Sequence, residues 1–205
     1  LNGISKVLHA DISDPLIMNY LDLVRKTNPN KLENKMVIYP GSCFLAQLAL
    51  DQDDYIYLSE LHNNEFEILK KNFKDDSRIV IEKKDAYASL DKMITSYQGT
   101  RLVLIDPSYE LKNEYDKICK LIKHNARQFP DVCFLVWYPI LEAEKTNAFV
   151  KQFIDLKIKN TTNIHIELKN TFLRMQGTGF FIINAPSTMQ KDIVPSLDIL
   201  LHILK

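Results

Sequence analysis

The sequence has few cysteines, no excess of charge and no long apolar run, and each shortage excludes a class of protein. Its three cysteines are odd in number, far apart and in no metal-like spacing, which argues against a disulfide framework and against a zinc site. No stretch approaches the ~20 apolar residues that span a bilayer, and the N-terminus has no signal-peptide pattern. We therefore expect reduced cysteines in the core and a cytoplasmic protein with no membrane partner.

The charges balance, with 26 Lys and Arg residues against 26 Asp and Glu residues. No overall field then holds a polyanion against the surface, so a nucleic-acid partner needs a local basic patch. Such runs are usually solvated faces of helices or strand ends, and that interpretation is favoured for every group here. The candidate groups are Lys70, Lys71 and Lys74; Lys83 and Lys84; and Lys120, Lys123 and Arg127.

The chain is long enough for one globular domain. At 205 residues and 46% hydrophobic content, such a domain buries roughly 70% of the surface of its unfolded chain. We predict a single domain over residues 1–205. Within it, 1–35 form a helical insert or cap, 36–186 the sheet core and 187–205 a C-terminal helix.

Short runs of aliphatic and aromatic residues alternate with helical patterns along the chain. This alternation predicts an α/β fold with a doubly wound, mostly parallel sheet. The run at 102–105 has four aliphatic residues without alternation, which is typical of a strand buried on both faces. The predicted strands lie at 36–39, 55–61, 78–82, 102–105, 132–138, 164–168 and 180–183.

Single residues indicate several boundaries of these elements. Asp14, followed by proline, is a predicted helix N-cap, and Ser42 is a predicted N-cap for the helix after the first strand. Pro139 is expected to end the strand that begins at residue 132. Gly177 and Gly179 are expected in a loop before the last strand.

Acidic residues follow three successive predicted strands: Glu60, Asp85 and Asp106. Because the carboxyl ends of parallel strands share one edge of a sheet, these carboxylates are predicted to line a common crevice. Taken singly, each is explained as well by a helix cap or a solvated loop acid. Three in consecutive units favour a ligand site.

The residue types suggest a role for each position in this crevice. Glu60 can accept the two hydroxyls of a ribose, and Asp85 can accept the exocyclic amine of an adenine ring. Asp106 and the carbonyl of Pro107 are two acceptors that a planar amine satisfies at once. Tyr109 offers a ring on which the attached base can stack.

Asp106-Pro107-Ser108-Tyr109 resembles the Asp/Asn-Pro-Pro-Tyr motif of S-adenosylmethionine-dependent amino-methyltransferases. More narrowly, the chain resembles the J-type methyltransferase family of bacterial 23S ribosomal RNA, from near Leu1 to about Pro186. The segments that carry this resemblance, in matching order and spacing, are Tyr39 to Ser42, Ser59 to His62, Leu104 to Glu110, Trp137-Tyr138-Pro139 and Gly179 to Pro186.

The resemblance implies a Rossmann-like methyltransferase fold with an antiparallel last strand. It implies methyl transfer from S-adenosylmethionine to the exocyclic amine of an adenine in 23S ribosomal RNA, with DNA left open as a substrate. Separately, we expect a monomer. The family has also been labelled as acting in the use of external DNA. In that family, the positions that contact the cofactor fall on Ser42, Glu60, Asp85, Ala86 and Asp106.

The same resemblance assigns the catalytic acceptor to Asp106 and the base-stacking aromatic to Tyr109. Trp137-Tyr138-Pro139 either walls the base pocket or belongs to the core, and the core is favoured. No metal is expected.

Two departures from the family pattern leave alternatives open. Ser108 stands where proline is usual, which frees a backbone N–H in the turn. Nothing matches the glycine-rich loop that follows the first strand of this fold, and the close pair Gly177 and Gly179 comes too late. We therefore expect that residues upstream of Leu1 supply a central strand and this loop. A non-catalytic nucleotide- or RNA-binding relative is the alternative.

Overall fold

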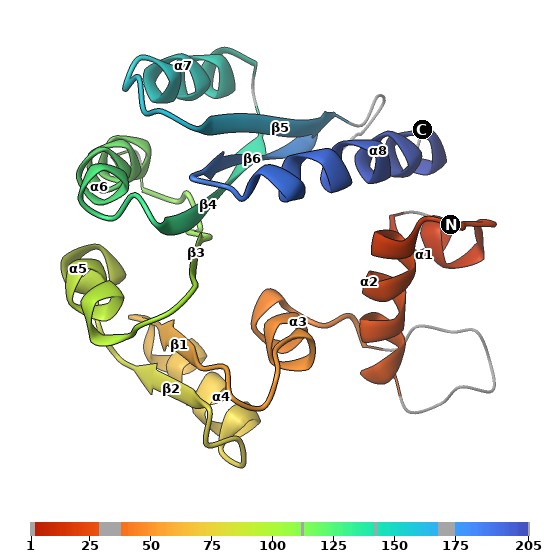
Figure 1. Cartoon of the computed structure of the whole chain (residues 1–205), viewed down its shortest axis with the longest axis horizontal. Helices are drawn as coiled ribbons and strands as arrows, with labels where there is room; N and C mark the ends of the chain where they lie inside the picture. Colours follow the sequence, from red (N-terminus) through yellow and green to blue (C-terminus); the bar gives the residue numbers. More distant parts are fainter. Residues whose placement is uncertain (1–2, 29–37, 112, 142, 168–174, 205) are drawn as a thin grey trace. The chain divides into compact units, whose positions relative to one another are not determined.

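The computed structural model describes residues 3–28, 38–111, 113–141, 143–167 and 175–204 (Figure 1). Helices and strands alternate along most of the chain. The helices are α1 (Ile4–His9), α2 (Pro15–Lys26), α3 (Ser42–Ala49), α4 (Asn63–Phe73), α5 (Ala86–Ser96), α6 (Glu114–Gln128), α7 (Ala143–Ile154) and α8 (Ser187–Leu204). The strands are β1 (Ile56–Ser59), β2 (Ile79–Glu82), β3 (Arg101–Ile105), β4 (Val132–Ile140), β5 (Thr161–Glu167) and β6 (Gly177–Ile183).

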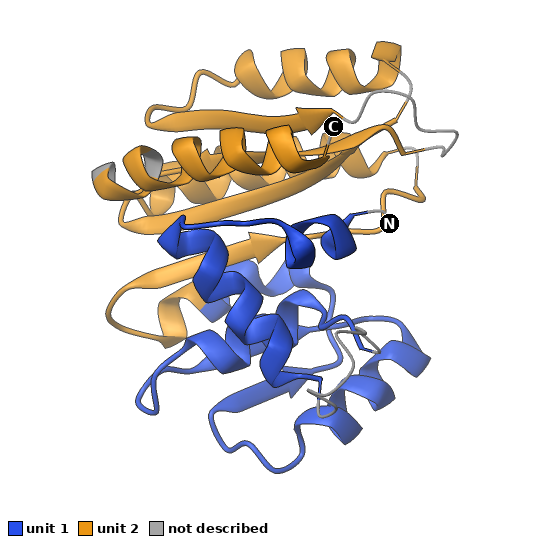
Figure 2. Ribbon diagram, turned by 90° about the vertical axis from the view of Figure 1, so that its right-hand side faces the viewer, with its two compact units in different colours: residues 1–93 blue, residues 94–205 orange. Residues whose placement is uncertain are grey.

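The chain divides into two compact units, Leu1–Met93 and Ile94–Lys205, which Figure 2 colours separately. Each unit is described by itself below. The single domain expected over residues 1–205 stays a prediction.

In the first unit, α2 begins as its sequence predicts. The Asp14 side chain accepts the backbone N–H of Ile17 at 2.9 Å, so it caps the helix before Pro15. Ile17, Leu21 and Val24 recur at helical spacing and are buried on one face. The cap prediction for this helix is confirmed.

The same unit holds a two-stranded parallel sheet, in which β1 pairs with β2 from Ile56 opposite Ile79 to Ser59 opposite Glu82. Helix α3 lies beside this sheet, with the Phe44 ring centroid 4.7 Å from that of Phe73 on α4. Both strands run in the same direction, so their carboxyl ends meet at one edge.

The second unit holds a four-stranded mixed sheet in the order β3-β4-β6-β5. β3 and β4 are parallel, and β6 is antiparallel to both β4 and β5. The largest fully buried side chains of this sheet include Phe134, Tyr138 and Phe181. The α/β fold class, with an antiparallel last strand, is confirmed.

The predicted strand at 36–39 is wrong in its described half. Met36 and Val37 lie outside the described residues, while Ile38 and Tyr39 form no strand. The amide of Asn28 bonds both the N–H and the carbonyl of Ile38, at 2.9 and 2.7 Å. These side-chain bonds replace the ladder that a strand would need.

Two predictions in the second unit are also wrong. Gly177 and Gly179 lie within β6 rather than in a loop. A Cβ at Gly179 would come within 2.1 Å of the Tyr138 ring, so glycine here permits close strand packing rather than a turn. Pro139 does not end β4, because the partner strand β3 stops opposite Val136 and leaves that side of β4 without a ladder.

The expectation that β3 is buried on both faces is wrong as well. Leu102 and Leu104 are 61% and 44% exposed, whereas Val103 and Ile105 on the opposite face are partly buried. β3 is an edge strand of its sheet, and one of its faces is open.

Candidate functional site

Glu60 and Asp85 lie just beyond the carboxyl ends of β1 and β2, the two parallel strands of the first unit. The Glu60 N–H donates to the carbonyl of Glu82 at 3.1 Å, which continues the ladder to the last residue of β2. The Ser59 hydroxyl donates to the Lys84 carbonyl at 2.8 Å, so the two chain segments stay together past the strands. The chain segments that carry Glu60 and Asp85 therefore lie side by side beyond the strands.

Each of these two carboxylates uses one oxygen in a local turn. Glu60 Oε1 accepts the His62 N–H at 2.7 Å, and Asp85 Oδ1 accepts the Tyr87 N–H at 2.9 Å. These bonds fix both side chains and start the helices that follow. Within the described residues, the second oxygen of each carboxylate makes no hydrogen bond and can accept a hydroxyl or an amine from a ligand.

Ser42 and Ala86 each stand at the start of a helix of this unit. Ser42 was expected to be an N-cap, but Gly41 holds that position and Ser42 is the first helical residue, without a side-chain cap bond. The backbone has non-helical torsions at Gly41 (φ −72°, ψ 168°) and is helical from Ser42, so the helix begins one residue earlier than predicted. Ala86 begins α5 directly after Asp85. Both residues are exposed.

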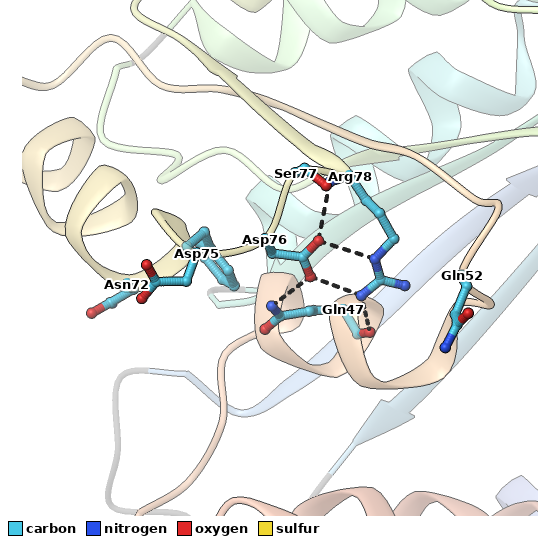
Figure 3. Close-up of a pocket in the computed structure, with 8 residues that line it drawn as sticks. Gln47, Gln52, Asn72, Asp75, Asp76, Ser77 and Arg78 are labelled. Carbon is cyan, nitrogen blue, oxygen red and sulfur yellow. Dashed lines mark hydrogen bonds and ion pairs between the residues drawn. The ribbon is translucent and has the colours of Figure 1, made fainter.

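A polar cavity of about 420 Å³ also lies in this unit (Figure 3). Arg78 donates to both oxygens of Asp76, from Nε at 3.0 Å and Nη2 at 2.8 Å. Gln47 donates to the same carboxylate at 2.8 Å. Arg78 Nη1 also donates to the carbonyls of Leu50 and Asp51, at 3.2 and 2.8 Å. The cavity residues are Gln47, Gln52, Asn72, Phe73, Asp75, Asp76, Ser77 and Arg78.

These bonds make Asp76 and Arg78 a structural clamp rather than a ligand site. The guanidinium caps the C-terminal end of α3, where helix carbonyls lack partners, and the carboxylate neutralises it. The same bonds hold the pKa of Asp76 well below its usual range. Sequence reasoning missed this pair, because its bonds to α3 join residues about 30 positions apart.

In the second unit, Asp106 directly follows β3. Asp106 and Ser108 are exposed and alternate with the partly buried Ile105 and Pro107. Although Asp106 is exposed, neighbouring atoms desolvate its carboxyl and raise its pKa above the ordinary value. An exposed acceptor with a raised pKa at the end of a parallel strand is a typical position for a reacting group.

Tyr109 adopts a backbone conformation that is rare for a side chain of its size, with φ at 55°. Its hydroxyl donates to the Trp137 carbonyl on β4. Its ring centroid lies 4.7 Å from that of Tyr115 on α6 and 5.8 Å from that of Trp137. The strained turn is therefore held by hydrogen bonding and ring packing from two other elements.

The alternative left open for Trp137-Tyr138-Pro139 is settled for Tyr138. That ring is fully buried against Phe149 and Phe181, and its hydroxyl donates to Asn163 Oδ1 at 2.8 Å. Trp137 is only partly buried and donates its ring N–H to the Thr178 hydroxyl. Tyr138 is a core residue, as the favoured interpretation predicted.

The sequence-predicted site residues thus fall in both units. Ser42, Glu60, Asp85 and Ala86 belong to the first unit, and Asp106, Pro107 and Tyr109 to the second. None of the three cysteines, all within the described residues, forms a disulfide, and burial raises the pKa of Cys119 to about 11. Among the residues that the structure describes, no group of His, Cys, Asp or Glu can hold a metal ion, and no helix has the length and apolar character to cross a membrane.

Comparison with known families gives a match over the whole chain. The family described as ribosomal RNA large subunit methyltransferase D, RlmJ, matches residues 1–205. The chain belongs to the RlmJ family. The resemblance seen in Asp106-Pro107-Ser108-Tyr109 and the neighbouring motifs is confirmed.

Two relatives in the RlmJ family carry the name ribosomal RNA large subunit methyltransferase J. The one from Haemophilus influenzae is 28% identical over 88% of this chain and 66% of its own length. The one from Escherichia coli K12 is 26% identical over 94% of this chain and 69% of its own length. The chain thus spans about two thirds of the length of these relatives.

A solved structure supports the fold. Protein LPL1258 from Legionella pneumophila matches with a TM-score of 0.80 and 27% identity, over 98% of this chain and 75% of that one. The arrangement of helices and strands described above is therefore shared with a crystal structure.

Proposed function

We propose that this RlmJ-family chain belongs to an enzyme that transfers a methyl group from S-adenosylmethionine to the exocyclic amine of an adenine in 23S ribosomal RNA. The observation that carries the proposal is the exposed, partly desolvated Asp106 at the end of β3, followed by the Pro107 carbonyl. Membership of a family named for ribosomal RNA methylation supports it. Such a substrate implies a cytoplasmic protein, and a monomeric state stays a prediction.

The donor set in the first unit fits the cofactor. Glu60 and Asp85 each keep one carboxylate oxygen for a ligand, beside the helix starts at Ser42 and Ala86. We assign the ribose hydroxyls to Glu60 and the adenine amine to Asp85, because carboxylates accept both kinds of donor. When bound, the cofactor supplies an electrophilic sulfonium methyl group.

Asp106 and Pro107 act on the substrate amine. An adenine amine is a poor nucleophile, since its lone pair is delocalised into the ring. When the Asp106 carboxylate and the Pro107 carbonyl accept its two hydrogens, they favour a pyramidal nitrogen with a localised lone pair. They also stabilise the positive charge that develops as the nitrogen is methylated. Asp106 can then take the proton that the product amine loses.

The target base must leave its stack to reach such acceptors, which suits a flipped or single-stranded adenine. We assign Tyr109 to hold that base by ring contact. Its strained turn next to Ser108 and its bond to the Trp137 carbonyl fix the position of the ring. Preorganisation of this kind contributes to rate by holding the reacting groups in place.

The experiment that tests this function is identification of the product. Full-length protein is incubated with S-adenosylmethionine labelled in the methyl group and with unmodified 23S ribosomal RNA, and the digested nucleosides are separated by mass spectrometry. We expect label in N6-methyladenosine. Label in another nucleoside, or label only in a DNA substrate of matched sequence, contradicts the proposal.

A non-catalytic nucleotide-binding protein is the second candidate, and the Ser108 departure favours it. Calorimetry with S-adenosylhomocysteine combined with the labelling assay separates the two functions. Cofactor binding without any labelled RNA would select the binding protein.

A further inference from the structure

We infer that the exposed face of α6 is a docking surface for the phosphate backbone of RNA, outside the residues assigned to cofactor and base. Helix α6 carries Lys120, Lys123 and Arg127, all exposed, on one side. The inference deepens the proposed function and rests on it for the identity of the partner.

Helix α6 is strongly amphipathic. Its apolar face, with Ile118 and Ile122 fully buried, packs into the second unit. The three cations recur at spacings of three and four residues, which places them on a common face over about 10 Å of helix. From Lys117 to Gln128 the sequence contains no acidic residue. Between Lys117 and Gln128 the charged residues of α6 are therefore all basic, although the net charge of the chain is zero.

The cations of this face are not engaged within the protein. In the described part of the chain, no hydrogen bond or ion pair joins the side chain of Lys120, Lys123 or Arg127 to another residue. Asp116, one turn before Lys120, instead accepts a hydrogen bond from Gln152 on α7 at 2.7 Å. Charges left in solvent on one face form a field that attracts an anion.

Most cations of the other two basic groups have a neighbouring ring or carboxylate, which the α6 cations lack in the described residues. Lys70 and Lys83 stand over the Phe66 ring, at 5.4 and 6.0 Å from its centroid. Lys74 lies 4.0 Å from Asp75, and Lys84 pairs with Glu82 at 2.6 Å. The α6 face is therefore the strongest candidate among the three groups for an external anionic partner.

The surface around these cations is open and shallow. Its lining residues all belong to α6 and are Lys120, Lys123, His124, Arg127 and Gln128. Successive phosphates along a nucleic-acid strand present negative charges at a spacing that a helix face of this length can follow. Contacts of this type position an RNA and carry no sequence information.

The test removes these charges and measures RNA binding without S-adenosylmethionine. Full-length protein carrying K120Q, K123Q and R127Q is titrated with a 23S ribosomal RNA fragment over a range of KCl concentrations. We expect at least a tenfold loss of affinity at low salt and a salt slope lower by about 2 to 3, because three phosphate contacts are lost. The matched control carries K70Q and K71Q on α4 and K74Q directly after it, and should bind as wild type does.

The outcomes separate this inference from the proposed function. Equal affinity and equal salt slope in wild type and the α6 variant would overturn the docking surface, even if RNA is methylated. A weakened α6 variant supports it even if wild type transfers no methyl group. Tighter binding of wild type to phosphatidylglycerol vesicles than to RNA would also overturn it. Equal thermal unfolding midpoints for all three proteins exclude a folding defect.

Discussion

Asp106 combines two properties that seldom occur together on a protein surface, exposure to solvent and a pKa raised by desolvation. In the proposed function, exposure gives the substrate amine access to the carboxylate. Desolvation strengthens its interaction with a positive charge, because less water competes for it. The cost is a carboxylate that is less stable when ionised than an ordinary surface aspartate.

We predict that the raised pKa of Asp106 appears in the pH dependence of methyl transfer. The raised pKa of Asp106 places the acid limb of kcat/KM above the ordinary aspartate value of about 3.9. A titration of the ¹³C-labelled Asp106 carboxyl by NMR, assigned with D106N, measures the same pKa directly. A carboxyl that titrates at or below the ordinary value contradicts the argument.

The raised pKa of Asp106 also predicts how the stability of the fold changes with pH. A folded-state pKa above the unfolded value means that ionised Asp106 destabilises the fold, and the effect disappears as pH falls below both values. D106N should therefore unfold at a higher temperature than wild type at pH 7, and the difference should narrow as pH falls toward 3.

Gly179 shows how a single missing side chain decides the packing of two strands. Its Cβ would meet the Tyr138 ring at 2.1 to 2.6 Å, and Tyr138 is buried with its hydroxyl bonded to Asn163. We predict that G179A lowers the free energy of unfolding by about 2 kcal/mol or more, since the ring cannot move without opening the core. Urea unfolding measures this change.

Gly41 provides the matched control for that substitution. A Cβ at Gly41 meets nothing within 4 Å, and its φ of −72° suits any residue. G41A should change the free energy of unfolding by less than about 1 kcal/mol. Similar losses for G41A and G179A would show that the contact with Tyr138 is not the cause.

At the scale of the elements, the Asp76 and Arg78 clamp joins the end of α3 to the start of β2. The guanidinium beside Asp76 holds the pKa of that carboxyl far below its usual range. A lowered folded-state pKa contributes stability that is present above about 3.9 and is lost as pH falls below it.

We therefore predict that D76N lowers the urea midpoint at pH 7, and that its difference from wild type shrinks as pH falls from 4 to 2. Exposed Asp75 provides the control, because its pairing with Lys74 is a long surface contact of 4.0 Å. D75N should unfold close to wild type at every pH. A D76N deficit that stays constant down to pH 2 contradicts the clamp.

Local patterns predicted most elements, and the failures have physical causes. The Asp14 cap and the acids that follow β1, β2 and β3 depend on neighbouring residues, so the sequence was sufficient for them. The predicted strand at Ile38 and the predicted loop at Gly179 were wrong because distant segments determine their conformation. These segments supply the Asn28 side chain and the Tyr138 ring. The bonds from Arg78 to the end of α3 could not be predicted for the same reason.

In the candidate site, too, local sequence predicted some features, and contacts with distant segments determined the others. Sequence spacing was enough to place Glu60 and Asp85 past neighbouring parallel strands. It did not predict that the Tyr109 ring packs against Tyr115 or that its hydroxyl bonds the Trp137 carbonyl. Those contacts arise from α6 and β4, whose packing no local motif encodes.

At the scale of the whole molecule, the chain carries its candidate site residues in two compact units and spans about two thirds of its curated relatives. Its zero net charge makes local surfaces decide which partner it binds, and the basic face of α6 is such a surface. In the proposed function, Ser42, Glu60, Asp85 and Ala86 bind the cofactor, Asp106 accepts the base amine, and the α6 face binds the RNA backbone.

The measurement that tests the central claim most directly is the rate of methyl transfer to 23S ribosomal RNA by full-length D106A and D106N, at saturating S-adenosylmethionine and RNA. Saturation separates a loss of chemistry from a loss of cofactor binding, and unchanged circular dichroism confirms the fold. We predict a fall in kcat of roughly 100-fold or more for both variants, because the amine loses its charged acceptor. Rates within threefold of wild type would contradict the assignment of Asp106.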